Sequence, residues 1–424
     1  MNVEKHLAII MENRSRVLGR LFIVSVLFWL VGCASNQTQT TDSEPYSTSV
    51  LPFTGDDTLH KKIFIFLDGT ANDASSETNV WKLYQRVIST NDQQTTAIYI
   101  SGVGTAESAP ISEAALGRGM ELRILEGYSF LVKNYSPGDD IILFGFSRGA
   151  HQARSLAGLV SYAGIIRNND DEADKFENAN RVIELVKKQR DVDYESKWQK
   201  WSRKDAPIMA SKIKEKLNLE VLPAIVRFLG VWDTVPGSSL KNYGICKEDI
   251  GFVKGGLSVF IPGVDRGERY KTDSYPSIQH IAHAVSLDEK RSKFAPLLVC
   301  EPIVSELTTV NETWFPGAHA DVGGGYKDSN ELPQLSLSWM IDELSEYYLL
   351  ASEQNQALNP SGLAHWSIGD SPANYLSKCE DRVPPEIADI HPSVNARRDA
   401  SPVPIRWKGN LRYMPYPVDC TQQE

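Results

Sequence analysis

From Lys62 onward, the pattern of hydrophobic and polar positions alternates short apolar runs with longer stretches of helical spacing. The apolar runs predict five strands, over residues 63–67, 96–100, 141–146, 225–231 and 308–315. The stretches with helical spacing predict helices over residues 78–88, 118–134, 148–163 and 335–350. Strands buried on both faces that alternate with helices form a mostly parallel sheet flanked by helices, so the pattern predicts the α/β class.

Two segments depart from this alternation and set the predicted domain boundaries. Residues 168–219 are strongly charged and have helical spacing without a strand, so they form either a helical cap over a site or a solvated surface insertion. After about Ala351 the chain is Pro-rich and loop-like. We therefore expect one α/β domain over residues 61–350 and a C-terminal tail, residues 351–424, that packs on it.

The N-terminus has the pattern of a secretory signal. Three arginines precede an apolar run over residues 21–31, and Gly32 and Cys33 follow it. The position of the cysteine resembles the bacterial lipoprotein signal, which implies cleavage before Cys33 and lipidation of that residue. An uncleaved membrane anchor is the alternative, although the run is short for a spanning helix, which needs about 20 apolar residues.

We therefore expect residues 1–32 to be a signal peptide. Residues 33–60 are rich in Ser, Thr, Gln and Asp and predict a disordered tether. A lipid on Cys33 would hold the protein on a membrane surface. The residue after Cys33 is Ala34 and not an aspartate. By resemblance to the sorting of bacterial lipoproteins, this favours the outer membrane, with the protein facing the periplasm.

Composition and charge narrow the possible partners. The 424 residues are 42% hydrophobic and 23% charged, as in globular proteins. The net charge of -10 argues against a nucleic-acid partner, because phosphate binding needs a basic face, but it leaves a lipid substrate open. The cysteines beyond Cys33 have no metal-ligand spacing, and we expect no cofactor. They could pair in three ways in an oxidising compartment or stay as buried thiols, and they are Cys246, Cys300, Cys379 and Cys420.

Ser147 is the strongest candidate for a catalytic residue. It lies in Gly-Phe-Ser-Arg-Gly between the predicted strand 141–146 and the predicted helix 148–163. A strand, this motif and a helix make up the nucleophile elbow of α/β hydrolases. The serine occupies a strained turn there, and glycines on both sides avoid collisions of Cβ atoms. The N–H of Arg148, at the start of the helix, can face a developing oxyanion.

A nucleophilic serine needs a histidine to accept its proton and a carboxylate to orient that histidine. In this fold the acid and then the histidine follow the serine along the chain, at the carboxyl ends of later strands. Asp233 follows the predicted strand 225–231, and His319 follows the predicted strand 308–315. The sequence therefore predicts a triad of Ser147, Asp233 and His319.

Two nearby residues offer alternatives to this set. His283 lies in a stretch over residues 282–289 that is predicted to be helical, where a histidine is more often structural. Asp321 could replace Asp233 as the acid, but it is only two residues from His319. Its other possible role is to brace the glycine-rich turn that it begins.

A second oxyanion donor is expected from the loop after the first predicted strand. The sequence Leu-Asp-Gly-Thr ends that strand, and the N–H of Gly69 or Thr70 is the candidate donor. The sequence Asp-Gly-Thr also suggests a phosphatase of the haloacid-dehalogenase type. That chemistry pairs two aspartates as Asp-x-Asp, whereas Phe66 occupies the first of these places.

Five sequence blocks, taken together, resemble one known family. In chain order they span residues 68–70, 145–150, 231–235, 283–289 and 314–325. They resemble the α/β-hydrolase domain of the first family of type VI secretion lipase effectors and its uncharacterised bacterial relatives, over roughly residues 62–350. The resemblance implies a phospholipase or esterase with Ser147, Asp233 and His319 at the matching positions and no required metal.

The lipoprotein signal departs from that family, whose secreted effectors are delivered without one. We therefore expect a resident envelope hydrolase, tethered near a membrane-lipid or acyl-ester substrate, rather than an antibacterial toxin. The alternative is a non-catalytic binding or scaffold lipoprotein of the envelope that retains a hydrolase fold, since a fold alone does not give function.

Overall fold

The computed structural model describes residues 48–105, 118–167, 172–188, 200–202, 205–236, 274–350, 357–368 and 377–422. The described residues all belong to one compact unit, residues 46–424. The predicted signal peptide, Cys33 and Cys246 lie outside the described residues. Among the described helices, none combines the length and the apolar character that crossing a membrane requires.

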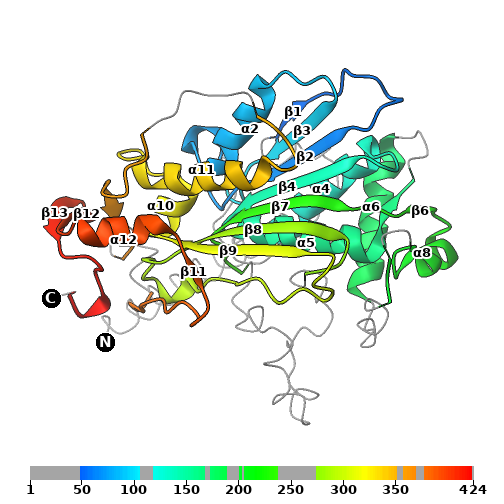
Figure 1. The fold of residues 1–424 in the computed structure, drawn as a ribbon. Helices are drawn as coiled ribbons and strands as arrows, with labels where there is room; N and C mark the ends of the chain where they lie inside the picture. Colours follow the sequence, from blue (N-terminus) through cyan, green and yellow to red (C-terminus); the bar gives the residue numbers. More distant parts are fainter. Residues whose placement is uncertain are drawn as a thin grey trace, which may run out of the picture. The chain divides into compact units, whose positions relative to one another are not determined.

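An eight-stranded sheet runs through the centre of this unit (Figure 1). The strand order is β1-β3-β2-β4-β7-β8-β9-β11. β1 pairs antiparallel with β3, and every other neighbouring pair is parallel. The bounds are β1 (Thr48–Leu51), β2 (Lys62–Leu67), β3 (Thr95–Ile100), β4 (Asp140–Phe146), β7 (Val226–Trp232), β8 (Ile278–Ser286), β9 (Thr309–Phe315) and β11 (Asp389–Ile390). The predicted class and the five predicted strands are confirmed.

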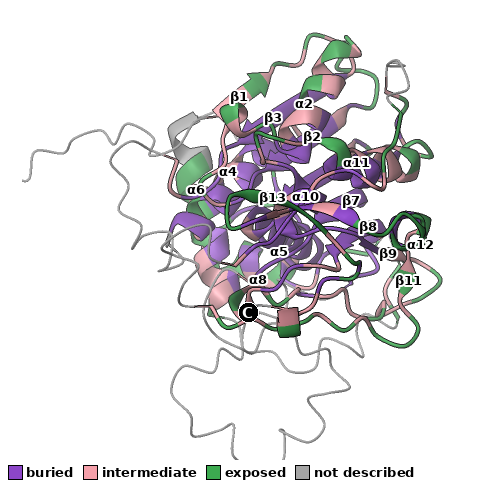
Figure 2. Cartoon of the chain, turned by 90° about the vertical axis from the view of Figure 1, so that its left-hand side faces the viewer, coloured by how far each residue is buried: buried purple, intermediate pink, exposed green. Residues whose placement is uncertain are grey.

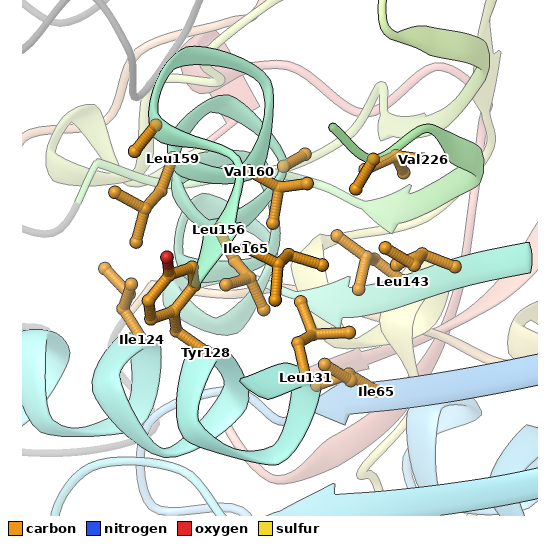
Figure 3. Close-up of a cluster of buried hydrophobic side chains, with 14 of the residues drawn as sticks. Ile65, Ile124, Tyr128, Leu131, Leu143, Leu156, Leu159, Val160, Ile165 and Val226 are labelled. Carbon is orange, nitrogen blue, oxygen red and sulfur yellow. The ribbon is translucent and has the colours of Figure 1, made fainter. Parts of the chain in front are cut away.

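Helices cover both faces of the sheet because each central strand is apolar on both sides. The bounds of the main helices are α2 (Asn79–Ser89), α4 (Arg118–Asn134), α5 (Arg148–Ala163), α6 (Glu172–Lys187) and α11 (Glu331–Leu344). Ile63 and Ile65 of β2 belong to a core with α4 and α5, where Ile65 lies near Leu131 and Leu143 (Figure 3). Phe64 of β2 belongs to a second core, which includes residues of α2 and α11. Figure 2 shows the central strands of the sheet buried and the outer helix faces exposed.

The stretch over residues 282–289 was predicted to be helical, and that prediction is wrong. Its first part, residues 282–286, belongs to β8, which lies between β7 and β9 in the sheet, and residues 287–289 are not helical. Every residue of β8 except Gln279 is buried, so both faces carry side chains of the interior and the twofold alternation typical of a half-exposed strand is missing. Without that alternation, the spacing of the apolar residues was also compatible with a helix.

The predicted tether also ends earlier than expected. Residues 33–60 were assigned to it, but Thr48–Leu51 form β1 and pair with β3 at the edge of the sheet. Two β-branched residues, Thr48 and Val50, favour an extended backbone, and the open edge of β3 supplies hydrogen-bond partners for it.

The insertion over residues 168–219 contributes α6 and α8 (Ala210–Leu217) in its described part. α6 packs on α4, where Lys187 forms an ion pair with Glu121 at 3.0 Å. α8 lies beside a short ribbon of β5 (Ile165–Ile166) and β6 (Val221–Leu222), at the end of the sheet away from α10 (Figure 1). The described residues of the insertion therefore flank the sheet, which favours the surface alternative over the cap.

The C-terminal segment is more ordered than its Pro-rich sequence predicts. It forms a three-stranded sheet in the order β10-β12-β13, and β11 adds to β9 of the central sheet. A separate apolar cluster, which includes Trp366 and Trp407 stacked at 4.2 Å, holds this sheet together. Cys379 and Cys420 form a disulfide, and Cys300 is also disulfide-bonded. The remaining bounds are α10 (His319–Gly323), β10 (Ala364–His365), α12 (Pro392–Asp399), β12 (Val403–Trp407), β13 (Asn410–Met414) and the 3₁₀ turns Ala74–Ser76, Ser292–Phe294 and Cys420–Gln422.

Candidate active site

Ser147 occupies a strained turn between the carboxyl end of β4 and the start of α5. Its backbone has φ 58° and ψ -122°, a conformation that costs a non-glycine residue on the order of 1–3 kcal/mol. Two hydrogen bonds fix the turn: Ser147 N–H donates to the carbonyl of Trp232 at 3.0 Å, and Val235 N–H donates to the carbonyl of Ser147 at 3.2 Å. The neighbouring strand end therefore holds the serine in this conformation.

The glycines on either side of Ser147 are required by the close approach of backbone atoms. A Cβ atom on Gly145 would lie 2.4 Å from the carbonyl oxygen of Gly149. A Cβ atom on Gly149 would lie 2.2 Å from the carbonyl oxygen of Leu67. Both contacts are too short for real atoms, and both partners are backbone, so a side chain at either position would displace the turn.

Asp233 and His319 lie in direct contact. His319 Nδ1 and Asp233 Oδ2 are 2.5 Å apart, and both side chains are buried. Asp233 follows β7, the strand beside β4, and His319 begins α10 just after β9. The ring of Phe146, which precedes the nucleophile, lies 4.6 Å from the His319 ring. The structure thus pairs the acid with the histidine, and it places Ser147 at the end of β4, the strand beside the one that Asp233 follows.

A cation also binds the acid, and the sequence analysis missed it. Arg382, from the C-terminal segment, donates from its two terminal nitrogens to the two carboxylate oxygens of Asp233 at 2.6 and 3.1 Å. Burial alone would raise the pKa of Asp233, but the guanidinium of Arg382 and the contact with His319 hold that pKa well below its usual range. Asp233 is therefore ionised.

A second buried acid, Glu289, contacts the backbone of His319. Glu289 accepts the backbone N–H of His319 at 3.2 Å and pairs with Arg291 at 2.7 Å. Burial opposes its ionisation, but the Arg291 guanidinium lowers the pKa of Glu289 to about 2. Two carboxylates and two guanidiniums thus surround the histidine, so the charges of the buried site balance.

His319 is held neutral and ready to accept a proton. Burial lowers the pKa of His319 below its usual 6.5, although the Asp233 carboxylate opposes this effect. Because Asp233 contacts Nδ1, the other ring nitrogen, Nε2, is left to act as the base. The ring packs edge-on against Phe294 at 5.1 Å, which fixes its orientation.

The loop after β2 reaches the nucleophile, as an oxyanion donor must. A Cβ atom on Gly69 would lie 3.2 Å from Ser147 Cβ. The N–H of Gly69, however, donates to the carboxylate of Asp68 at 2.7 Å, so of the two predicted amides Thr70 is the better candidate. Burial raises the pKa of Asp68 to about 6, and its other oxygen accepts from Tyr99 at 2.6 Å. Arg148 is the first residue of α5, at the positive end of the helix dipole.

The two alternative residues have other partners. His283 is fully buried in β8, where its Nδ1 lies 2.8 Å from Glu312 and its Nε2 accepts the N–H of Thr234 at 3.1 Å. It therefore supports the backbone next to Asp233. Asp321 accepts the N–H of Ala318 at 2.9 Å and contacts His365 at 2.7 Å, so it braces the turn that presents His319.

Part of this network carried a signal in the sequence and part did not. Glu289 closes one of the sequence blocks, so its position could have been examined as a partner of the triad. Arg382 lies in a segment without a motif or an apolar period, and nothing along the chain connects it to Asp233. Within the described residues, no group of three or more His, Cys, Asp or Glu side chains is arranged to hold a metal ion.

A serine on a sharp turn above a mostly parallel sheet defines the α/β-hydrolase fold, and this chain has that fold. A comparison with protein families narrows the class further. The family model for the catalytic domain of Tle1-like phospholipase effectors of type VI secretion matches residues 61–343. The chain therefore belongs to the Tle1-like family, as the resemblance of the sequence blocks implied.

Individual relatives are more distant. The uncharacterized protein YEL023C of Saccharomyces cerevisiae is 24% identical over 360 residues, which cover 78% of this chain and 45% of the yeast protein. The chain thus spans about half the length of this relative. A Tle1 effector bound to the VgrG spike is 21% identical, with 69% of this chain and 56% of that chain covered and a TM-score of 0.28. An esterase of Thermogutta terrifontis with bound butyrate is 10% identical, with 75% and 94% covered and a TM-score of 0.37.

Proposed function

We propose that this protein is a serine hydrolase that cleaves acyl esters of membrane lipids with a triad of Ser147, Asp233 and His319. The observation that carries the proposal is the buried Asp233–His319 pair, 2.5 Å apart, beside the strained turn of Ser147. The family supplies the substrate class, because its model describes phospholipase effectors.

The reaction follows from the roles of these groups. His319 takes the proton of Ser147, whose oxygen attacks the ester carbonyl, and Asp233 stabilises the imidazolium that forms. The backbone N–H groups of Arg148 and Thr70 stabilise the oxyanion of the tetrahedral intermediate. The protonated histidine then gives its proton to the leaving alcohol. Water, activated by the same histidine, releases the acyl group from the serine.

The proposed place of work is the bacterial envelope. Its support is the cysteine at position 33 directly after a signal-like apolar run, which would carry a lipid anchor. Metabolic labelling of the full chain with a palmitate analogue tests this part. We expect label on the wild type and none on Cys33→Ala; equal labelling of the two proteins would refute the anchor.

Covalent labelling by a fluorophosphonate probe tests the catalytic proposal. We expect the wild type to be labelled and Ser147→Ala to remain unlabelled. Ser161→Ala is a matched control. Ser161 is a buried serine of α5, the helix that follows Ser147, and its hydroxyl donates to the carbonyl of Ala157. A folded wild type that resists the probe would instead indicate a non-catalytic binding or scaffold protein.

Analysis of the reaction products identifies the class of substrate. Purified enzyme incubated with vesicles of mixed phospholipids should release fatty acid and lysophospholipid, which mass spectrometry identifies. Release of fatty acid from a short-chain ester but not from vesicles would retain the serine hydrolase and refute the membrane-lipid substrate.

A further inference from the structure

We propose that Arg382 is a positioning residue of the active site, which holds the Asp233 carboxylate in the orientation in which it contacts His319. The inference rests on the proposed triad. Arg382 lies outside residues 61–343, the part of the chain that the family model matches. The C-terminal segment would therefore supply a part of the site that the matched catalytic domain lacks.

The geometry of Arg382 is that of a fixed clamp. Its terminal nitrogens reach both oxygens of Asp233, at 2.6 and 3.1 Å. The same nitrogens donate to the carbonyls of Ser286, at 2.6 Å, and Phe294, at 2.5 Å. Ser286 ends β8 and Phe294 ends the 3₁₀ turn that follows it, so the planar guanidinium is bound on two sides by backbone. Only 6% of the side chain is exposed.

Asp233 has few other partners that could replace this clamp. Oδ1 accepts the N–H of Ser286 at 3.0 Å, and Oδ2 contacts His319. A fully buried carboxylate that loses its cation is strongly disfavoured, so without Arg382 it would take up a proton or turn toward another donor. Either change would remove the group that orients His319.

Backbone contacts on the chain just before Arg382 set its position. Cys379 forms a β-bridge with Arg291, and Glu380 N–H donates to the carbonyl of Lys290 at 2.9 Å. Asp381 forms an ion pair with Lys290 at 2.7 Å. Arg382 thus extends into the site from a short ladder that is joined to the loop after β8.

The other charged groups that face the Asp233–His319 pair come from this same loop. They are Glu289 and Arg291, which pair with each other at 2.7 Å. Arg382 therefore has no substitute among them, because the guanidinium of Arg291 is already bound by Glu289 through two nitrogens, at 2.7 and 2.9 Å.

The test compares Arg382→Met and Arg382→Lys with the wild type in the full chain. The measurement is the second-order rate of fluorophosphonate labelling as a function of pH. For Arg382→Met we expect a rate lower on the order of 100-fold, because the base is misplaced. We also expect its acidic limb to move down by about one pH unit, because an Asp233 that is protonated or turned away no longer stabilises protonated His319.

The lysine variant separates charge from geometry. Arg382→Lys keeps the cation but loses the two-pronged contact, so we expect a rate lower by about tenfold and an acidic limb close to that of the wild type. Arg406→Met is the matched control, since Arg406 also lies in the C-terminal segment and also binds an aspartate of the α/β domain, Asp328, at 2.9 Å. Its rate and pH profile should equal those of the wild type.

The outcomes are distinct. A folded Arg382→Met protein with the rate and pH profile of the wild type would overturn the positioning role and leave the proposed function intact. If Arg382→Met fails to fold, a wild-type rate for Arg382→Lys overturns it. A wild type that the probe does not label overturns both the proposed function and this inference.

Discussion

The disulfide between Cys379 and Cys420 offers a quantitative test of how the C-terminal segment is held. The perturbation is the double substitution Cys379→Ser with Cys420→Ser, which opens the loop without touching the second bonded cysteine, Cys300. Chemical reduction would break the disulfide bond of Cys300 as well. Arg382 lies inside the opened loop, so stability and reactivity should change together.

The magnitude follows from the length of the loop. The two cysteines are 41 positions apart, and the chain-entropy relation for a loop of this size gives about 13 cal/mol/K, or about 4 kcal/mol at 25 °C. A unit of roughly 380 residues has an unfolding entropy of about 0.8 kcal/mol/K. The double variant should therefore melt about 5 °C below the wild type.

Calorimetry or circular dichroism measures the melting temperature, and fluorophosphonate labelling of Ser147 follows the site. Cys379→Ala with Cys420→Ala controls for the polarity of the introduced serines and should give the same shift. A decrease smaller than about 1 °C in both double variants would refute the reasoning. It would mean that the closed loop does not restrict the unfolded chain, or that the native state gains an equal amount when the bond is removed.

Four further predictions concern the site itself. Asp233→Asn should lower kcat for a soluble ester by about 10⁴-fold, because an amide favours the wrong tautomer of His319; a fall of less than tenfold would contradict the triad. The acidic limb of kcat/KM for the wild type should lie below pH 6.5, since burial lowers the pKa of His319, and a limb above pH 7 would exclude that. Glu289→Gln should cost about 3 kcal/mol of stability at pH 7 in urea unfolding, because the pKa of Glu289 is about 2 when folded and 4.5 when unfolded. This difference is fully present above pH 4.5 and should vanish as the pH falls toward 2; a constant difference would refute the assignment. Gly149→Ala should abolish labelling of Ser147, since the new Cβ would lie 2.2 Å from the carbonyl oxygen of Leu67, and a labelled variant would show that the turn can relax.

Much of the fold could be predicted because its strands are long, apolar and separated by helices. β2, β3 and β4 are buried on both faces, and a short continuous apolar run of this kind is typical of a strand inside a parallel sheet. Part of β8 was mistaken for a helix because a strand inside a parallel sheet lacks the alternation that marks a half-exposed one. β11 has only two residues, and it exists because β9 offers it an edge, which no local pattern reveals.

The residues of the candidate site could also be predicted only in part. Ser147, Asp233 and His319 each follow a recognisable strand, so their chain order and the fold placed them near one edge of the sheet. Arg382 is joined to Asp233 across 149 positions, and only the packing of the tail brings them together. The choice between Gly69 and Thr70 as oxyanion donor also needed coordinates, because it depends on one hydrogen bond to Asp68.

The distance in sequence between Arg382 and its partner has a consequence for the order of events during synthesis. Serine, acid and histidine all leave the ribosome before Arg382, and Cys420 follows near the end of the chain. If Arg382 orients the acid, a growing or freshly made chain carries the whole triad yet lacks its alignment. Hydrolytic activity would then appear only after the tail has docked, so a chain that stops short of Arg382 would carry the triad without being a working enzyme.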